Sequence, residues 1–78
     1  MKQSDVVRST HGHDKGGIFM VLAVEGEYVF LADGRKRRVE KPKKKKIKHA
    51  QKIASMQFNL DNATNKSVWA ALKQYREG

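Results

Sequence analysis

Three short segments of strand-forming residues, separated by glycine-containing turns, occupy the first 32 residues and limit the folds open to this chain. Residues 18–24 are apolar throughout and too few for a core helix, so they predict a strand covered on both faces. Residues 5–9, with Val6 and Val7, and residues 27–32 predict two further strands. Glu25-Gly26 predicts a tight turn between the second strand and the third.

The strand pattern continues beyond residue 32. Asp33-Gly34 is a strong hairpin signal, because both central positions of a type I′ turn need positive φ. Residues 35–41 are expected to return as the next hairpin strand with Val39 facing inward, and Pro42 marks the end of that strand or a kink in it. Ile47 could centre a short last strand flanked by lysines. These segments predict about five short strands joined by tight turns.

The spacing of apolar residues changes in the C-terminal part of the chain. Residues 54–62 alternate apolar and polar side chains, which suggests an extended segment lying along the barrel. From residue 64 onward the spacing becomes that of a helix, and Thr64 or Asn65 can cap it. Trp69 is expected to pack this helix against the barrel and not to form a platform for a ligand. One face of the helix, over residues 64–77, carries an apolar stripe of Val68, Ala71, Leu72 and Tyr75.

The predicted fold is therefore mainly β: a small SH3-like barrel of about five strands over residues 5–60, with a C-terminal α-helix over residues 64–77. The 78 residues are expected to form one domain with a thin core. The chain has no cysteine, which excludes disulfides and thiolate sites. Its N-terminus lacks the apolar region of a signal peptide, and its longest apolar run is far shorter than a bilayer span. We expect a cytoplasmic protein.

Positive charge is concentrated in residues 35–52. This segment holds eleven Lys or Arg residues and one acid, Glu40, so its formal charge is +10, whereas that of the whole chain is +9. Like charges this close repel one another, so a partner that neutralises them is the natural explanation. Nucleic acid fits best, because each neutralised phosphate releases condensed counterions. The alternative for Lys43–Lys46 is a solvated, partly disordered lysine run.

The loop over residues 9–17 carries a recognisable pattern, with three glycines and no apolar side chain. Gly12, a spacer, Asp14-Lys15-Gly16, then Phe19 and Val21 resemble a KOW motif. That motif spans a strand end, a glycine loop and the start of the next strand. It occurs in SH3-like barrels of ribosomal proteins and of NusG-type transcription factors.

The resemblance extends into the basic segment, residues 35–52. The stretch over residues 27–49 reads EYVFLADGRKRRVEKPKKKKIKH. It is similar to KOW-type RNA-binding proteins related to the archaeal and eukaryotic large-subunit ribosomal protein fourteen. There an aspartate-glycine turn precedes a basic strand, Lys-Pro-Lys-Lys-Lys and a histidine, which match residues 41–45 and His49. The likeness covers about residues 6–49 and, more weakly, 65–75, and the chain lacks the longer C-terminal extension of the ribosomal members. It implies an SH3-like barrel that binds RNA, ribosomal RNA first, as a ribosomal or ribosome-associated protein.

The residues expected to contact RNA come from the glycine loop and the basic segment. Glycines leave backbone N–H groups open to a phosphate, arginines favour bidentate contacts and lysines act as point charges. No aromatic residue lies in residues 35–52, so contacts to phosphate and 2′-hydroxyl are expected to dominate over base stacking. The predicted contact residues are Arg8, Gly12, His13, Lys15, Gly16, Gly17, Arg35, Lys36, Arg37, Arg38, Lys41, Lys43, Lys44, Lys45, Lys46, Lys48 and His49.

Other functions have weaker support in the sequence. His11, His13 and Asp14 could be drawn as a metal site, but three ligands within four loop residues, with no fourth elsewhere, are a weak signal. No catalytic constellation is present, so we expect neither an enzyme nor a cofactor. A transcription-linked module of NusG-like KOW type, binding nucleic acid or protein, remains the alternative. A polybasic protein of the membrane surface is also conceivable, although no amphipathic helix accompanies the cluster. The expected partners are RNA and ribosomal proteins, without a membrane, and the expected state is a monomer.

Overall fold

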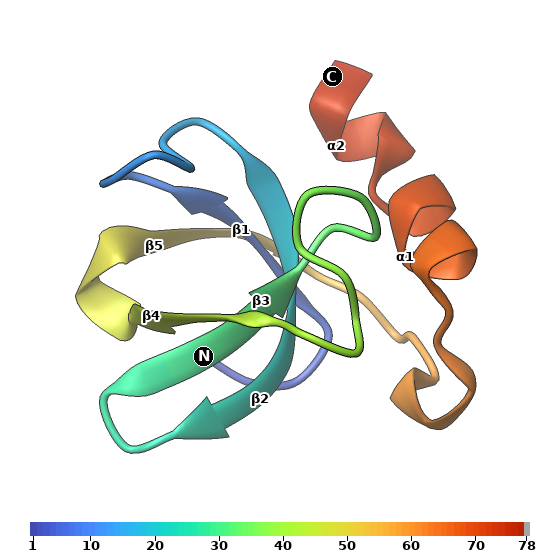
Figure 1. The fold of residues 1–78 in the computed structure, drawn as a ribbon, viewed down its shortest axis with the longest axis horizontal. Coiled ribbons are helices and arrows are strands. Elements are labelled where there is room, and N and C mark those ends of the chain that lie inside the picture. The colour runs from blue at the N-terminus through green and yellow to red at the C-terminus, as the bar shows by residue number, and fades with distance from the viewer. Residues whose placement is uncertain (78) are drawn as a thin grey trace.

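A computed structural model describes residues 1–77. Five strands form one antiparallel sheet in the order β4-β3-β2-β1-β5, and two short helices cover one end of it (Figure 1). The mainly β class is confirmed, and the strand order is consistent with a small SH3-like barrel. The strands are β1 (Asp5–Ser9), β2 (Ile18–Glu25), β3 (Tyr28–Ala32), β4 (Lys43–Lys46) and β5 (Ala50–Ser55). The helical elements are η1 (Ile47–His49), η2 (Leu60–Asn62), α1 (Asn65–Ala71) and α2 (Lys73–Glu77).

The core has two sides, because successive residues of β1 and β2 point to opposite faces of the sheet. Val6 pairs with Met20 and faces one cluster, whereas Val7 pairs with Phe19 and faces the other. All four side chains are buried. The apolar run of β2 is thus covered on both faces, as predicted, because each face has its own cluster to pack against.

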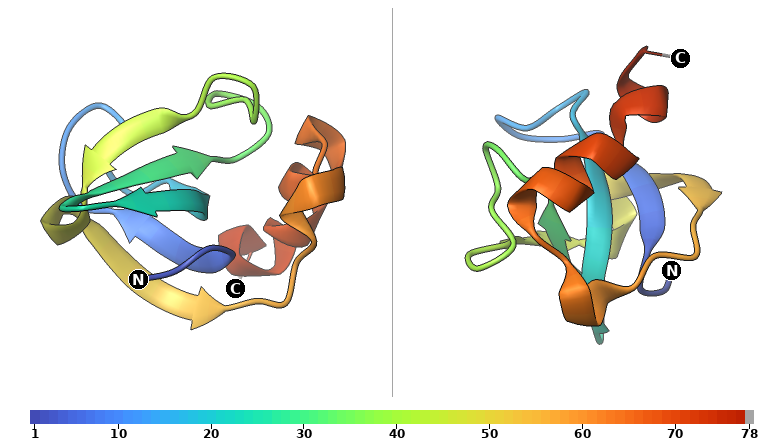
Figure 2. Two further views of the ribbon diagram at one scale, coloured as in Figure 1. Left: turned by 90° about the horizontal axis from the view of Figure 1, so that it is seen from below. Right: turned by 90° about the vertical axis from the view of Figure 1, so that its right-hand side faces the viewer.

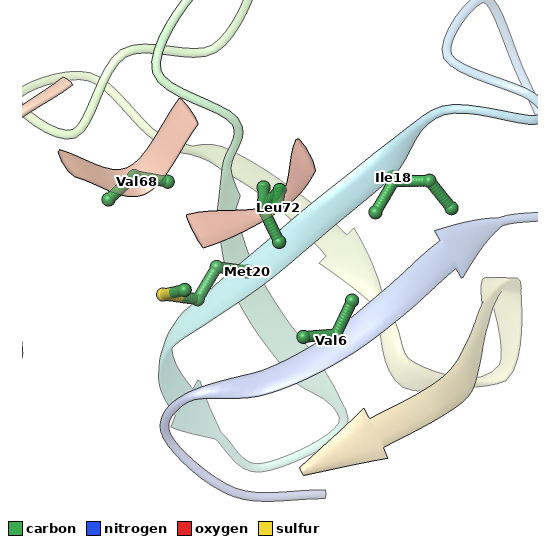
Figure 3. Packing of buried hydrophobic residues seen from close by; sticks show 5 residues of the cluster. All are labelled: Val6, Ile18, Met20, Val68 and Leu72. Atoms are coloured by element: carbon green, nitrogen blue, oxygen red, sulfur yellow. The ribbon is translucent and has the colours of Figure 1, made fainter. Parts of the chain in front are cut away.

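The helices close the first of these clusters. Val68 and Leu72 are fully buried against Val6, Ile18 and Met20. Figure 3 shows both side chains reaching from the helical segment toward β1 and β2. The extended segment between β5 and η2 adds alternate side chains to the same cluster, Met56 and Phe58, as its period predicted. The helical stripe therefore serves the barrel core.

The predicted single helix is divided in two at Leu72. This residue is the C-cap of α1, with φ −85° and ψ −7° in the right-handed helical region, and α2 begins at the next residue. The start of α1 follows the prediction. Thr64 is its N-cap, accepting the N–H of Ser67 at 3.0 Å, and the Ser67 hydroxyl lies 2.9 Å from the Thr64 nitrogen, which completes a capping box.

The predicted hairpin turn at Asp33-Gly34 is wrong, and so is the strand over residues 35–41. Instead, the Asp33 carboxylate accepts the backbone N–H groups of Arg35 and Arg37, each at 2.9 Å, and folds the chain into a loop. Gly34 has φ +88° and a Cβ there would overlap the backbone oxygen of Asn65. A glycine is therefore needed at position 34 because the chain passes close to α1 there, and not because it forms a hairpin turn.

The partner strand of β3 is β4, which begins after Pro42 and places Lys43 opposite Leu31. Pro42 thus precedes a strand and does not end one, in keeping with its missing N–H donor. Ile47 is also displaced from its predicted role. It lies in η1, the turn between β4 and β5, and packs against the second core cluster.

Candidate nucleic-acid interface

The glycine loop, residues 10–17, joins β1 to β2 and is closed by its own backbone. Lys15 N–H donates to the Gly12 carbonyl at 3.1 Å, and Gly16 N–H donates to the Ser9 carbonyl at 2.7 Å. Gly16 has φ +88°, a conformation that L side chains rarely adopt, and a Cβ there would meet nothing within 4 Å. The space beside the Gly16 Cα is therefore open to a ligand, whereas its N–H is already used within the loop.

The loop between β3 and β4, residues 33–42, is the basic loop, and one ion pair ties it to the glycine loop. Arg37 Nη2 lies 3.1 Å from Asp14 Oδ2 and 3.4 Å from Oδ1, and the Asp14 side chain is only 10% exposed. A guanidinium that reaches both oxygens of a largely buried carboxylate fixes direction as well as distance. Both loops project from the same side of the molecule, at left in the right-hand view of Figure 2.

A second link joins the glycine loop to β4. Lys45 Nζ donates to the Ser9 hydroxyl and to the His11 carbonyl, both at 2.6 Å. The backbone N–H of Thr10 donates to the His49 carbonyl at 3.0 Å, which holds the loop to the end of η1. Lys45 is therefore a structural cation that organises the site. Two of its three N–H donors are already used, whereas its positive charge is not offset because both acceptors are neutral.

His11 and His49 stack over this second link, with ring centroids 4.1 Å apart and an angle of 27° between the rings. Desolvation lowers the pKa of His49, and the positive charges of His11, Lys48, Lys45 and Lys46 lower it further. An anion bound beside these cations would offset their repulsion and raise the pKa of His49 again. The pair therefore suits a surface that meets phosphate.

The strand β4 presents its lysines alternately. Lys44 and Lys46 are exposed, whereas Lys43 and Lys45 are half-buried. Lys44 Nζ lies 4.5 Å from the centroid of the Tyr28 ring, so the aromatic face holds this ammonium over β3. The glycine loop, β4 and η1 together surround a depression of about 510 Å³, the basic groove. Its lining consists of His11, Gly12, His13, Asp14, Tyr28, Arg37, Lys43, Lys44, Lys45, Lys46 and His49.

Not every predicted contact residue lies in this groove. Arg8 is exposed on β1, opposite Gln51 of β5. It lines neither the basic groove nor the depression formed by the basic loop and the start of β4. Arg38 forms an exposed ion pair with Glu40 at 3.2 Å. The remaining predicted cations occupy exposed positions of the loops and η1, outside the lining of the groove: Lys15, Arg35, Lys36, Lys41 and Lys48.

Sequence reasoning missed three side chains that the fold brings to the cations: Tyr28, Trp69 and Arg76. The guanidinium carbons of Arg35 and Arg76 lie 4.2 Å and 3.4 Å from the centroid of the Trp69 ring. Trp69 is half-buried and belongs to neither core cluster, so its place differs from the predicted packing role. The only signal in the sequence was its position one residue beside the apolar stripe.

The residues drawn as a metal site are otherwise engaged. Asp14 is paired with Arg37, and the His11 ring is stacked on His49. Within residues 1–77, no group of three His, Asp or Glu side chains is placed to hold a metal ion. None of the described helices has the length and apolar character needed to cross a bilayer.

No model of a known protein family matches the chain, and no curated protein matches it significantly. A function for this protein therefore has to follow from the chemistry of the basic groove and of the two loops that border it. The KOW-type resemblance of the glycine loop stays a hypothesis.

Proposed function

We propose that this protein binds RNA through one continuous basic face made of the glycine loop, the basic loop, β4 and η1. The observation that carries the proposal is the pair of links that join these segments. Arg37 binds Asp14, and Lys45 binds Ser9 and His11, so that residues far apart in sequence form a single surface. The RNA we propose is ribosomal, as the KOW-type resemblance implies, with the protein as a ribosomal or ribosome-associated component.

The charge of this face supports a phosphate-rich ligand. Lys43–Lys46 line the basic groove, where few carboxylates offset them, and Asp14 is already paired with Arg37. Gly16 is exposed next to Lys15, so the absence of a side chain there leaves room for a phosphate at the tip of the glycine loop. Binding a polyanion would relieve the mutual repulsion and release counterions.

Structured RNA suits the face better than duplex DNA. A-form RNA has a wide, shallow minor groove lined by 2′-hydroxyls, which an open glycine backbone and arginine side chains can contact. Such contacts position the protein on the helix without reading base sequence. We therefore expect the protein to select RNA by the shape of its helix and by the 2′-hydroxyl groups of its sugars, and not by base sequence.

Salt dependence tests the phosphate contacts. If about five phosphates are neutralised at once, log K against log salt should have a slope of about −4, using about 0.9 per phosphate. Changing Lys43, Lys44 and Lys46 to Gln should make this slope shallower by about one for each phosphate that is no longer neutralised, and Lys45 is left in place because it organises the glycine loop. Lys66→Gln with Lys73→Gln, two exposed lysines of the helices, is the matched control. An unchanged slope in the first variant would leave β4 as a solvated lysine run.

A chemical-shift titration with an RNA hairpin and a DNA duplex of equal length, at the same salt, tests the ligand class. We expect shifts in both the glycine loop and β4, and tighter binding of the RNA. Lys15→Glu should weaken binding by adding repulsion at the loop tip, while the fold is kept because Lys15 is exposed. Equal affinity for both ligands would favour the NusG-like alternative or a nonspecific polycation, and a silent glycine loop would contradict the continuous face.

A further inference from the structure

A second pocket, of about 360 Å³, adjoins the basic groove on the side of the helices. Its volume is within the usual range of small-ligand sites, about 300–1,000 Å³. The glycine loop contributes Lys15, the basic loop contributes Arg35 and Lys36, and the helices contribute Trp69 and Arg76. We call this the helix-side pocket. It shares His13 and Asp14 with the basic groove, so a strand leaving the groove enters it directly.

The positive charges of the helix-side pocket are not neutralised by its own carboxylates. Its two carboxylates are already engaged: Asp14 binds Arg37, and Asp33 accepts the backbone N–H groups of Arg35 and Arg37. By contrast, the four basic side chains of the pocket form no ion pair among residues 1–77: Lys15, Arg35, Lys36 and Arg76. Nη1 of Arg76 is buried and has no hydrogen-bond partner within residues 1–77. An anionic acceptor is the group that such a set lacks.

Trp69 orders the two arginines. Their guanidinium carbons lie over its ring at 4.2 Å for Arg35 and 3.4 Å for Arg76, which holds two flexible side chains in place before a ligand arrives. Because these side chains are already ordered, less of their conformational entropy is lost when a ligand binds. Arg35 lines the pocket and is exposed, so a planar group of a ligand can reach its side chain. Guanidinium planes are surfaces on which unstacked RNA bases pack.

The pocket also has an apolar floor. Ile18 and Phe19, at the start of β2, line it beneath the cations and are almost fully buried. A free phosphate would use only the cations, whereas a nucleotide has both a charged group and a flat, weakly polar base. The pocket offers an apolar floor, a guanidinium held in place by Trp69, and cations without ion-pair partners. Together these features favour a nucleotide over a simple anion.

We propose that the helix-side pocket takes one unpaired nucleotide, such as a bulged or loop residue, of an RNA held on the basic face. Its phosphate binds Arg76 with Lys15 or Lys36, and its base stacks on Arg35. This inference rests on the proposed function and adds a role for the helices, which the sequence pattern assigned to stability alone. It also supplies the base stacking for which the basic segment itself has no aromatic residue.

The test uses Trp69 as its own probe, because it is the only tryptophan of the chain. The protein is titrated with two RNA hairpins of equal length, one with a single bulged nucleotide and one fully paired. We expect the bulged hairpin to bind at least about fivefold more tightly, as one stacked base allows, and to change the Trp69 fluorescence more strongly. Equal binding with unchanged fluorescence would overturn the pocket and leave the proposed function standing. Binding of neither hairpin would overturn both.

Two variants of α2 sharpen the result. Arg76→Gln should lose the preference for the bulged hairpin while keeping its affinity for the paired one. Lys73→Gln removes the same charge from an exposed site outside the pocket and should keep the preference. Arg35→Gln, on the other side of the pocket, should also lose the preference, and it should weaken binding of both hairpins because Arg35 belongs to the basic loop of the proposed face. Melting temperatures are recorded for all three variants. A preference that survives both arginine substitutions would overturn the proposal.

Discussion

At the scale of single residues, the buried carboxylate of Asp5 connects β1 to β5. Its side chain is inaccessible, accepts the Ser55 hydroxyl at 3.0 Å and the Lys2 backbone N–H at 2.9 Å, and lies 3.7 Å from Lys52 Nζ. Burial works to raise the pKa of Asp5, but these hydrogen bonds and the positive charge of Lys52 outweigh it, so the pKa is lowered. The ionised form therefore stabilises the fold.

The predicted consequence is a loss of stability in acid. A lowered carboxyl pKa contributes stability that is present above the unfolded value, about 3.9, and is lost as the pH falls through the folded value. Asp5→Asn should cost about 1–3 kcal/mol at neutral pH, because it leaves buried partners poorly satisfied. Urea unfolding between neutral pH and pH of about 3 should show a smaller acid-dependent loss for this variant than for the parent. Asp61→Asn, at an exposed position, is the control.

His49 is the residue through which pH should affect RNA binding. Its pKa is lowered in the free protein, first by desolvation and then by neighbouring positive charges. A bound phosphate would favour the charged imidazole and raise this pKa, so binding takes up a proton and affinity should increase as the pH falls through the pKa of the RNA-bound state. The lowered pKa also makes the free fold less stable as the pH falls below the unfolded value, about 6.5, because the unfolded chain binds the proton more readily.

An NMR titration of the imidazole signals checks this expectation. The His49 pKa should lie below its ordinary value without RNA and rise when RNA is added. His11→Asn should raise the His49 pKa in the free protein by removing one nearby positive charge, although desolvation remains. A His49 pKa that is unaffected by RNA would place this residue outside the interface.

At the scale of elements, Asn65 is the point where the basic loop meets α1. Its side-chain oxygen accepts the Val39 N–H at 2.8 Å, and its nitrogen donates to both Glu40 oxygens at 2.8 Å and 2.9 Å. The Asn65 hydrogen bonds hold the pKa of Glu40 below its usual value. The loop that carries four successive basic residues is therefore positioned by a helix some 25 residues further along the chain.

Removing the Asn65 side chain should loosen the basic loop without unfolding the sheet. Asn65→Ala is expected to cost about 1–2 kcal/mol and to speed amide exchange at Val39, whose N–H loses its acceptor. RNA affinity should fall because the loop arginines are no longer held in place. Asn62→Ala, at an exposed position in η2, is the matched control and should change neither quantity. Unchanged exchange at Val39 in Asn65→Ala would show that other contacts position the loop.

At the scale of the whole molecule, the helices complete the core of a small sheet. Leu72 is fully buried at the junction of α1 and α2, in one cluster with strands β1 and β2. Leu72→Ala should cost about 2–5 kcal/mol, a large part of the stability of a domain this small, because the cavity cannot close completely. Thermal unfolding measures the loss, and the exposed neighbour Lys73→Ala should stay within about 0.5 kcal/mol of the parent. A full melting temperature in Leu72→Ala would mean that the sheet is stable without this helix contact.

The features that could be predicted from sequence depend on local chemistry. The apolar run of β2 and the valine pair of β1 bury both faces because alternate side chains on a strand point in opposite directions. Thr64 caps a helix because its hydroxyl reaches the N–H three residues on. The concentration of positive charge in residues 35–52 is likewise set by the sequence, whereas the binding of an anion there stays a prediction. These signals act over a few residues, so tertiary contacts did not override them.

The remaining features were decided by contacts between residues distant in sequence. Asp33-Gly34 has a local preference for a hairpin, but the close approach of Gly34 to Asn65 and the hydrogen bonds of Asp33 outweigh it. The placement of Trp69 beside Arg35 depends on where the helices pack. Whether a lysine is free or structural also depends on its neighbours, since Lys45 reaches a hydroxyl 36 residues away. Residue type and spacing therefore determined the strands and the charge of this protein, whereas only tertiary packing decided which cations are held together and which are open to a ligand.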